Sequence, residues 1–70
     1  MTYKVTLYHP NNNPSVRTEV KKWVELHCKS YDASRSINMV LVAIGGSFYA
    51  QKDYFFENEK DAVLFSLRWA

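Results

Sequence analysis

The sequence predicts an α+β domain with the element order β-α-β-β-α, in which a three-stranded antiparallel sheet carries both helices on one face. Three patterns predict this arrangement. Apolar residues alternate with polar ones near the N-terminus, they recur at helical spacing in two later segments, and Gly45-Gly46 separates two runs rich in β-branched and aromatic residues. Seventy residues provide enough apolar surface for a single core, so we expect one domain, residues 1–70.

Residues 2–8 form the first predicted strand, because apolar and polar side chains alternate there with the two-residue period of a half-buried strand. One face carries Tyr3, Val5 and Leu7, and the other carries Lys4, Thr6 and Tyr8. Pro10 cannot donate to a sheet and asparagine favours turns, so we expect the strand to end before it and His9 to lie in a solvated loop.

The first helix is predicted to begin at Pro14. Asn13 can accept a hydrogen bond from a free backbone N–H as the N-cap, and proline is well tolerated at the first helical position. The helix would bury one stripe of residues at helical spacing and expose the charged residues opposite. This stripe consists of Val16, Val20, Trp23, Val24 and His27.

The two runs around Gly45-Gly46, residues 37–44 and 47–57, give the strongest hairpin signal in the chain. If Ile44 lies opposite Ser47, the alternation of side chains defines both faces of the hairpin. We expect the core face to carry Met39, Leu41, Ala43, Phe48, Ala50, Lys52, Tyr54 and Phe56. The opposite face would carry Val40, Val42, Ile44, Tyr49, Gln51, Asp53 and Phe55.

The second helix is predicted to begin near Glu59, because Asn58 and Asp61 resemble a capping box and Glu59 places negative charge at the positive end of the helix dipole. Its side chains are apolar on nearly every side. We expect Ala62, Phe65 and Trp69 to face the sheet, and Val63 and Leu67 to touch the first helix. No predicted element lies opposite Leu64. Either the helix is buried on all sides between the sheet and the first helix of a small core, or Leu64 contacts another chain.

With the third strand in the centre, the arrangement resembles a ferredoxin-like fold that lacks its last strand. Nothing in the chain would then cover the second face of the sheet, an apolar and aromatic surface of several hundred Å² by a rough estimate. We predict that this open face binds another protein or a second copy of the chain. The predicted contact residues are Tyr8, Val40, Val42, Ile44, Tyr49, Phe55 and Leu64, with Lys4 and Gln51 at the rim.

Single-stranded nucleic acid is the alternative partner, since Tyr8, Tyr49 and Phe55 beside Lys4 could stack bases on the same face. A formal net charge of +2 and the lack of an RNA-recognition motif make this alternative weaker. The longest apolar run is too short to cross a membrane, and no signal peptide begins the chain. We expect a cytoplasmic protein without membrane contact.

The residues capable of catalysis, metal binding or phosphate binding form no recognisable motif. His27 and Cys28 are neighbours on a helix and point about 100° apart, so they cannot form a nucleophile–base pair. One cysteine and two histidines are a poor supply of metal ligands, and Gly45-Gly46 lacks the spacing of a phosphate-binding loop. The sequence therefore predicts a non-enzymatic protein with no catalytic, metal or cofactor site, in which Cys28 is a small buried apolar residue.

The C-terminal segment YFFENEKDAVLFSLRW resembles an ending found in small proteins of tailed bacteriophages, in which F-x-x-x-x-D-A-x-x-F-x-L-x-W follows an aromatic strand. The matching positions are Phe56, Asp61, Ala62, Phe65, Leu67 and Trp69. This resemblance covers about a quarter of the chain and carries no catalytic residue with it. It implies a phage-encoded accessory protein that binds and modulates a host protein in the bacterial cytoplasm.

Overall fold

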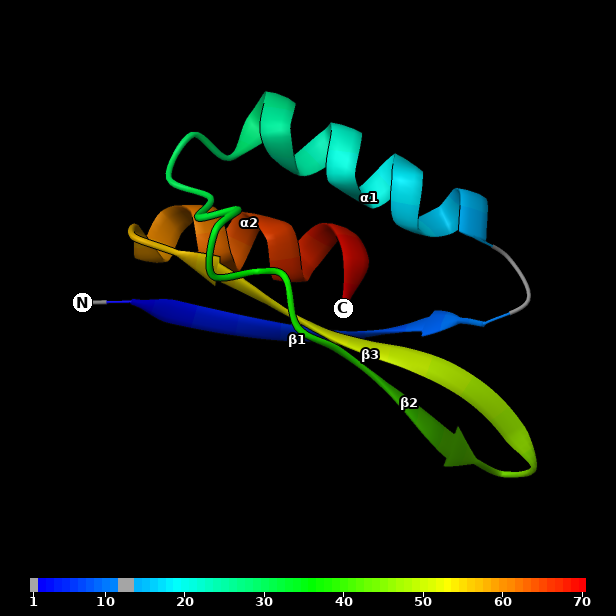
Figure 1. Cartoon of the computed structure of the whole chain (residues 1–70). Coiled ribbons are helices and arrows are strands. Elements are labelled where there is room, and N and C mark those ends of the chain that lie inside the picture. The colour runs from blue at the N-terminus through cyan, green and yellow to red at the C-terminus, as the bar shows by residue number, and fades with distance from the viewer. Residues whose placement is uncertain (1, 12–13) are drawn as a thin grey trace.

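The computed structural model of the protein describes residues 2–11 and 14–70. Its elements are β1 (Tyr3–Pro10), α1 (Pro14–His27), β2 (Met39–Ile44), β3 (Ser47–Phe56) and α2 (Glu59–Trp69). The strands form one antiparallel sheet in the order β1-β3-β2, and both helices lie on the same side of it (Figure 1). The predicted α+β fold, its element order and its central third strand are confirmed.

Strand β1 is longer than predicted, and this changes the environment of His9. The strand continues through Pro10, and His9 pairs with Ala50 of β3. Pro10 is tolerated because it is the last residue of an edge strand, where its missing N–H removes no ladder hydrogen bond. His9 is therefore buried at 2% exposure, and the prediction of a solvated loop residue was wrong.

The glycine turn sets the register of the hairpin as predicted. Gly45 and Gly46 have φ angles of 58° and 82°, in the left-handed region that glycine enters without steric cost. Ile44 lies opposite Ser47, and the pairing continues to Met39 opposite Lys52. Every residue of β2 thus lies on the face that the alternation predicts.

The core lies between the helices and the β1–β3 part of the sheet. Phe65 of α2 is fully buried, with its ring centroid 4.8 Å from that of Tyr54 and 5.2 Å from that of Phe56. Around these rings lie Leu7, Val20, Val24, Cys28 and Ala62. Val20 and Val24 belong to the predicted stripe of α1, but His27 does not close it: His27 is exposed, with its ring 4.7 Å from that of Trp23.

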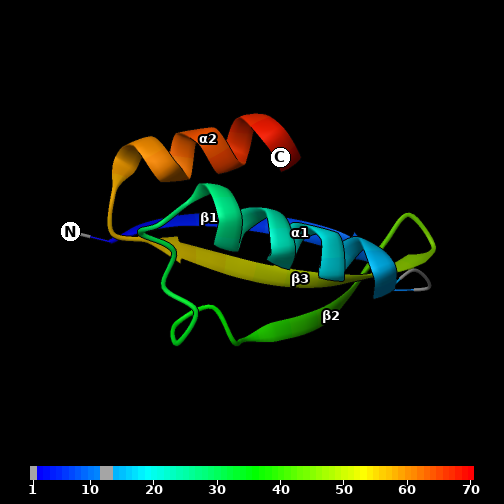
Figure 2. The ribbon, with the colours of Figure 1, turned by 90° about the horizontal axis from the view of Figure 1, so that it is seen from above.

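The helices cover only part of the sheet. Helix α1 packs against β1 and α2, and α2 packs against β1 and β3, whereas the backbone of neither helix comes close to β2. The Arg17 side chain of α1 reaches β2 at Met39. Figure 2 shows β2 beyond the area that the helices cover. Ala50, Tyr54 and Phe56 are buried as predicted and Lys52 is half-buried. The other residues of the predicted core face are exposed because no helix lies over them: Met39, Leu41, Ala43 and Phe48.

Helix α2 begins as predicted, but part of its expected environment was wrong. The Asn58 side chain accepts a hydrogen bond from the Lys60 N–H at 2.7 Å, as an N-cap should. Asp61 does not complete a capping box; its carboxylate accepts hydrogen bonds from Ser30 instead. Val63 and Leu67 do not pack on α1 and are 50% and 80% exposed. The predicted cap of α1, Asn13, lies outside the described residues.

Candidate interaction surface

The open face of the sheet brings together eight of the nine residues predicted to make contacts. Register places Tyr8, Gln51 and Val40 in one row across the three strands, and Tyr49 beside Val42 in the next. Lys4 lies opposite Phe55, and Ile44 ends the hairpin. Tyr8, Val40 and Ile44 are 52%, 58% and 51% exposed, so a partner can reach this face directly.

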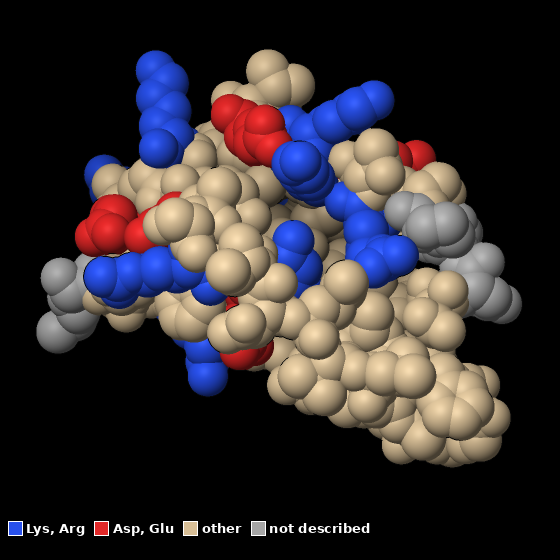
Figure 3. Space-filling model, viewed as in Figure 1, with Lys and Arg blue, Asp and Glu red and all other residues tan. Residues whose placement is uncertain are grey.

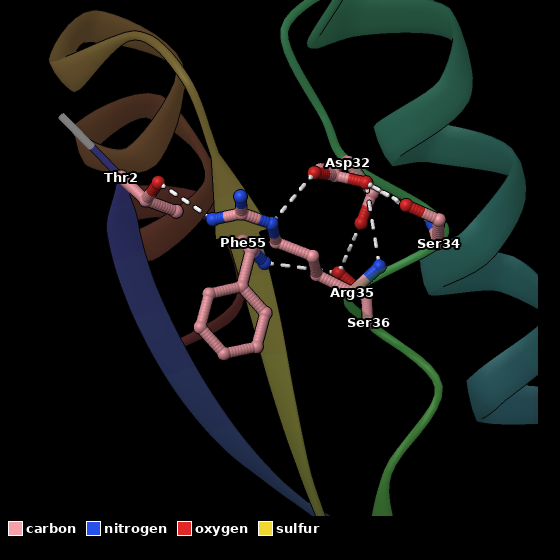
Figure 4. A network of polar contacts seen from close by, with 6 residues as sticks. All are labelled: Thr2, Asp32, Ser34, Arg35, Ser36 and Phe55. Carbon is pink, nitrogen blue, oxygen red and sulfur yellow. Dashed lines mark hydrogen bonds and ion pairs between the residues drawn. The ribbon is translucent and has the colours of Figure 1, made fainter.

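A polar loop partly covers the Phe55 end of this face (Figure 4). Ser36 accepts a hydrogen bond from the Phe55 N–H at 3.0 Å, and the Arg35 guanidinium reaches across to the Thr2 hydroxyl at 2.9 Å. Asp32 holds the loop, because its carboxylate accepts from Ser34 and pairs with Arg35 at 3.3 Å. The hydrogen bond from Ser34 is the main reason that the pKa of Asp32 lies below its usual range. Phe55 is therefore half-buried and contributes less surface than predicted.

In the row next to Tyr8 the open face carries a polar pair that interrupts its apolar character. Thr6 and Asp53 are register partners on β1 and β3, and the Thr6 hydroxyl donates to the Asp53 carboxylate at 2.6 Å. This pair separates the Phe55 end from the rows of Tyr8 and Tyr49. The accessible apolar surface consequently lies toward the β2–β3 hairpin.

Leu64 belongs to a different surface. It lies on α2, on the side of the sheet that carries the helices, and is 43% exposed. With Val63, Leu67, Glu59 and Lys60 it lines a shallow hollow of about 330 Å³. The structure thus separates Leu64 from the other predicted contact residues.

A second cleft lies where the edge of β1 meets both helices. It has a volume of about 360 Å³ and is lined by Leu7, His9, Val16, Trp69 and neighbouring residues. The Trp69 indole Nε1 is buried without a hydrogen-bond partner among the residues that the structure describes. His9 Nε2 lies 2.9 Å from the Tyr54 hydroxyl, which anchors the imidazole against the core.

Burial and two nearby cations favour the neutral form of His9. Burial is the largest cause that lowers the pKa of His9 below its ordinary value of 6.5, and repulsion from Lys52 and Arg17 adds to it. Burial also raises the pKa of Tyr54, with Tyr31 contributing. The His9–Tyr54 contact is therefore a hydrogen bond between two neutral groups, with the donor set by the imidazole tautomer.

We expect the free energy of unfolding to fall as the pH is lowered from about 7 to about 5. The unfolded chain takes up a proton at histidine near pH 6.5, while the folded protein resists it, so protonation favours unfolding. Urea denaturation followed by circular dichroism at both pH values measures this change. The His27→Gln variant should retain the pH dependence and His9→Gln should lose most of it; equal stability of the wild-type protein at both pH values would contradict a neutral buried His9.

Cys28 and His27 are not brought together. Cys28 is 1% exposed, and burial, with a smaller effect from Asp61, raises the pKa of its thiol to about 11. Its Sγ lies 3.7 Å from the Asp61 carbonyl oxygen, whereas His27 is exposed and stacks on Trp23. The expectation of a buried Cys28 is confirmed. Among the described residues no three His, Cys, Asp or Glu side chains gather closely enough to hold a metal ion.

Sequence reasoning missed the exposed residues on the helix side of the hairpin, Met39, Leu41 and Phe48, which extend the apolar surface around its edge. No local pattern shows this, because it depends on where the two helices lie across the sheet. No helix in the described part of the chain is long and apolar enough to cross a membrane. Searches of protein-family models, curated proteins and solved structures found nothing that matches this chain.

Proposed function

We propose that the protein is a non-enzymatic interaction module that binds a partner protein through the β2–β3 hairpin and the adjoining open face of the sheet. One observation carries this proposal: no charged residue occurs from Met39 to Gln51, yet large apolar side chains on both sides of this segment are exposed. Val40 and Ile44 lie on the open side, and Leu41 and Phe48 on the helix side. Figure 3 shows the same region as a lobe without charged atoms.

Exposing these large apolar side chains to water is unfavourable for the isolated chain. Burial of apolar area contributes about 25 cal/mol per Å², and large contiguous apolar patches on soluble proteins mark interaction sites. Tyr8 and Tyr49 add aromatic side chains, which dominate the energetics of protein interfaces. These properties support binding to a protein rather than to a small polar ligand.

The resemblance of the C-terminal residues to tailed-phage proteins supports a more specific proposal about the partner. In that setting the hairpin would bind a host protein in the bacterial cytoplasm. The matching residues Ala62 and Phe65 are buried and Asp61 bonds to Ser30, so the resembling segment supports the fold that presents the hairpin. The contact residues lie outside this segment, apart from Phe55 on β3 and Leu64 on α2.

A pull-down from a bacterial lysate with matched variants tests the proposal. The Val42→Glu, Tyr49→Glu double variant places two carboxylates on the open face, and we expect it to lose the proteins that the wild type retains. A Lys22→Gln, Lys29→Gln variant lowers the net charge by the same amount, at two exposed positions in α1 and just after it. This control variant should retain the proteins that the wild type binds. Identical sets of proteins from the wild type and the glutamate variant would end the proposal.

Single-stranded nucleic acid remains the alternative partner, favoured by the exposed ring of Tyr8 on the face that also carries Lys4. Asp53 on that face opposes the approach of phosphates. Salt distinguishes the two partners, because phosphate contacts make affinity fall steeply with ionic strength whereas an apolar interface responds weakly.

A further inference from the structure

A pocket of about 260 Å³ lies on the helix side of β2, where α1 stops short of the edge of the sheet. It is lined by Arg17, Thr18 and Lys21 of α1, Met39 of β2 and Lys52 of β3. Leu41 lies on the same face of β2 as Met39 and is 58% exposed. Apolar and cationic side chains thus face the same open space.

None of the three cations of this pocket forms an ion pair with a carboxylate of the described residues. The ion pair found among the described residues joins Arg35 to Asp32, at the other end of the sheet. Arg17 instead donates to the Met39 Sδ at 3.1 Å, a weak acceptor for a guanidinium. Lys52 is half-buried; burial lowers its pKa, and repulsion from Lys21 and Arg17 lowers it further. In Figure 3 Lys and Arg side chains gather above the uncharged hairpin.

The neighbouring edge of β2 offers backbone hydrogen-bonding groups. A two-residue turn closes on a hydrogen-bonded pair, here Ile44 and Ser47, and such pairs alternate along an antiparallel ladder. The N–H and C=O groups of Val40 and Val42 therefore face β3. Those of Leu41 and Ala43 face away from β3, at an edge beyond which residues 2–11 and 14–70 place no further strand. An apolar edge without charged or proline residues is open to pairing with another extended segment.

We propose that the edge of β2 and the pocket that carries Arg17, Lys21 and Lys52 together bind an extended, acidic segment of the partner protein. This segment would pair with β2 as a fourth strand of the sheet. The inference rests on the proposed interaction function and specifies the chemistry of the partner. An added strand lies about 4.8 Å from β2 and alternates its side chains between the two faces. Carboxylates on its helix side come within reach of Arg17, Lys21 and Lys52, and apolar residues on its other side extend the row of Val40 and Val42.

Charge argues against a second copy of the chain as the occupant. Antiparallel pairing of two β2 strands would leave both Arg17–Lys21–Lys52 clusters without an acidic partner, because β2 itself carries no acidic residue. Opposite charges across an interface, in contrast, favour the encounter. An acidic strand would complement both the free backbone groups of the β2 edge and the positive charge of Arg17, Lys21 and Lys52.

Two short peptides serve as probes, one in which valine and glutamate alternate and one in which valine and lysine alternate. Two-dimensional NMR of the isotope-labelled full chain measures their binding. The glutamate peptide should shift the amide signals of Leu41 and Ala43 and slow their hydrogen exchange, and the lysine peptide should bind at least about tenfold more weakly. The Lys21→Glu variant should bind the glutamate peptide about fivefold more weakly.

The Lys22→Glu variant is the matched control, because it changes the same charge on α1 outside the pocket and should bind within about twofold of the wild type. Equal binding of both peptides, or equal loss from both variants, overturns the inference. The inference is also overturned if an oligothymidylate binds more tightly than the glutamate peptide and loses affinity in the Lys21→Glu variant. A wild-type protein that dimerises and thereby protects the Leu41 and Ala43 amides overturns it as well. If neither peptide binds while the pull-down still depends on Val42 and Tyr49, the acidic strand alone is refuted and the interaction function stands.

Discussion

A Phe65→Ala variant should be largely unfolded at about 25 °C, because it removes the side chain on which both layers of the core pack. Phe65 is fully buried and joins α2 to Tyr54 and Phe56 of β3. Replacing a buried phenylalanine by alanine costs about 3–5 kcal/mol. A single core in a chain of this size rarely supplies more than about 3–5 kcal/mol of net stability.

Thermal unfolding followed by circular dichroism measures this effect, and Leu67→Ala provides the control on the same helix. Leu67 is 80% exposed, so its truncation should change the free energy of unfolding by no more than about 0.5 kcal/mol. A Phe65→Ala variant that melts cooperatively near the wild-type temperature would show that the core does not depend on this ring.

The second large effect is expected at Asp61, where Asp61→Ala should lower the free energy of unfolding by about 2–3 kcal/mol. Its Oδ2 accepts hydrogen bonds from the Ser30 N–H at 3.0 Å and the Ser30 hydroxyl at 2.6 Å. Ser30 in turn accepts from the N–H groups of Glu57 and Asn58. The carboxylate therefore ties the end of α1 to the start of α2, and its removal leaves a partly buried N–H without a partner.

For a domain of this size the loss corresponds to a melting temperature lower by roughly 10–20 °C. Glu59→Ala is the matched comparison, since Glu59 is exposed in the same helical turn and contributes mainly through the helix dipole, about 0.3–1 kcal/mol. If the two variants melt at the same temperature, the Ser30 contact has no stabilising role beyond the charge of the carboxylate.

The sequence predicted those features of the fold that depend on local pattern. The alternation in β1, the Gly45-Gly46 turn and the Asn58 cap each follow from residues close together in the chain, and the structure confirms all three. Because side-chain faces follow from register, the open-face residues could also be placed together in advance. The Val40 and Val42 rows are where the alternation puts them.

The features that could not be predicted depend on contacts between distant residues. His9 is buried because its imidazole meets the Tyr54 hydroxyl, and Asp61 departs from the capping pattern because Ser30 reaches it from the end of α1. Periodicity also gives the face of a residue but not its position across the sheet. Leu41 shares a face with Tyr54, yet it is 58% exposed because no helix extends over β2.

The position of β2 outside the helical layer has a consequence for how the domain opens. Its side chains bury little within the chain, so the ladder to β3 is nearly all that holds it. Detaching it exposes little additional apolar area, and the free energy of this sub-global opening is a small part of that needed to disrupt the Phe65 core. The strand can therefore adjust its twist or separate briefly while the rest of the domain stays folded. A ligand bound along its edge would raise the free energy of this local opening and make β2 more rigid.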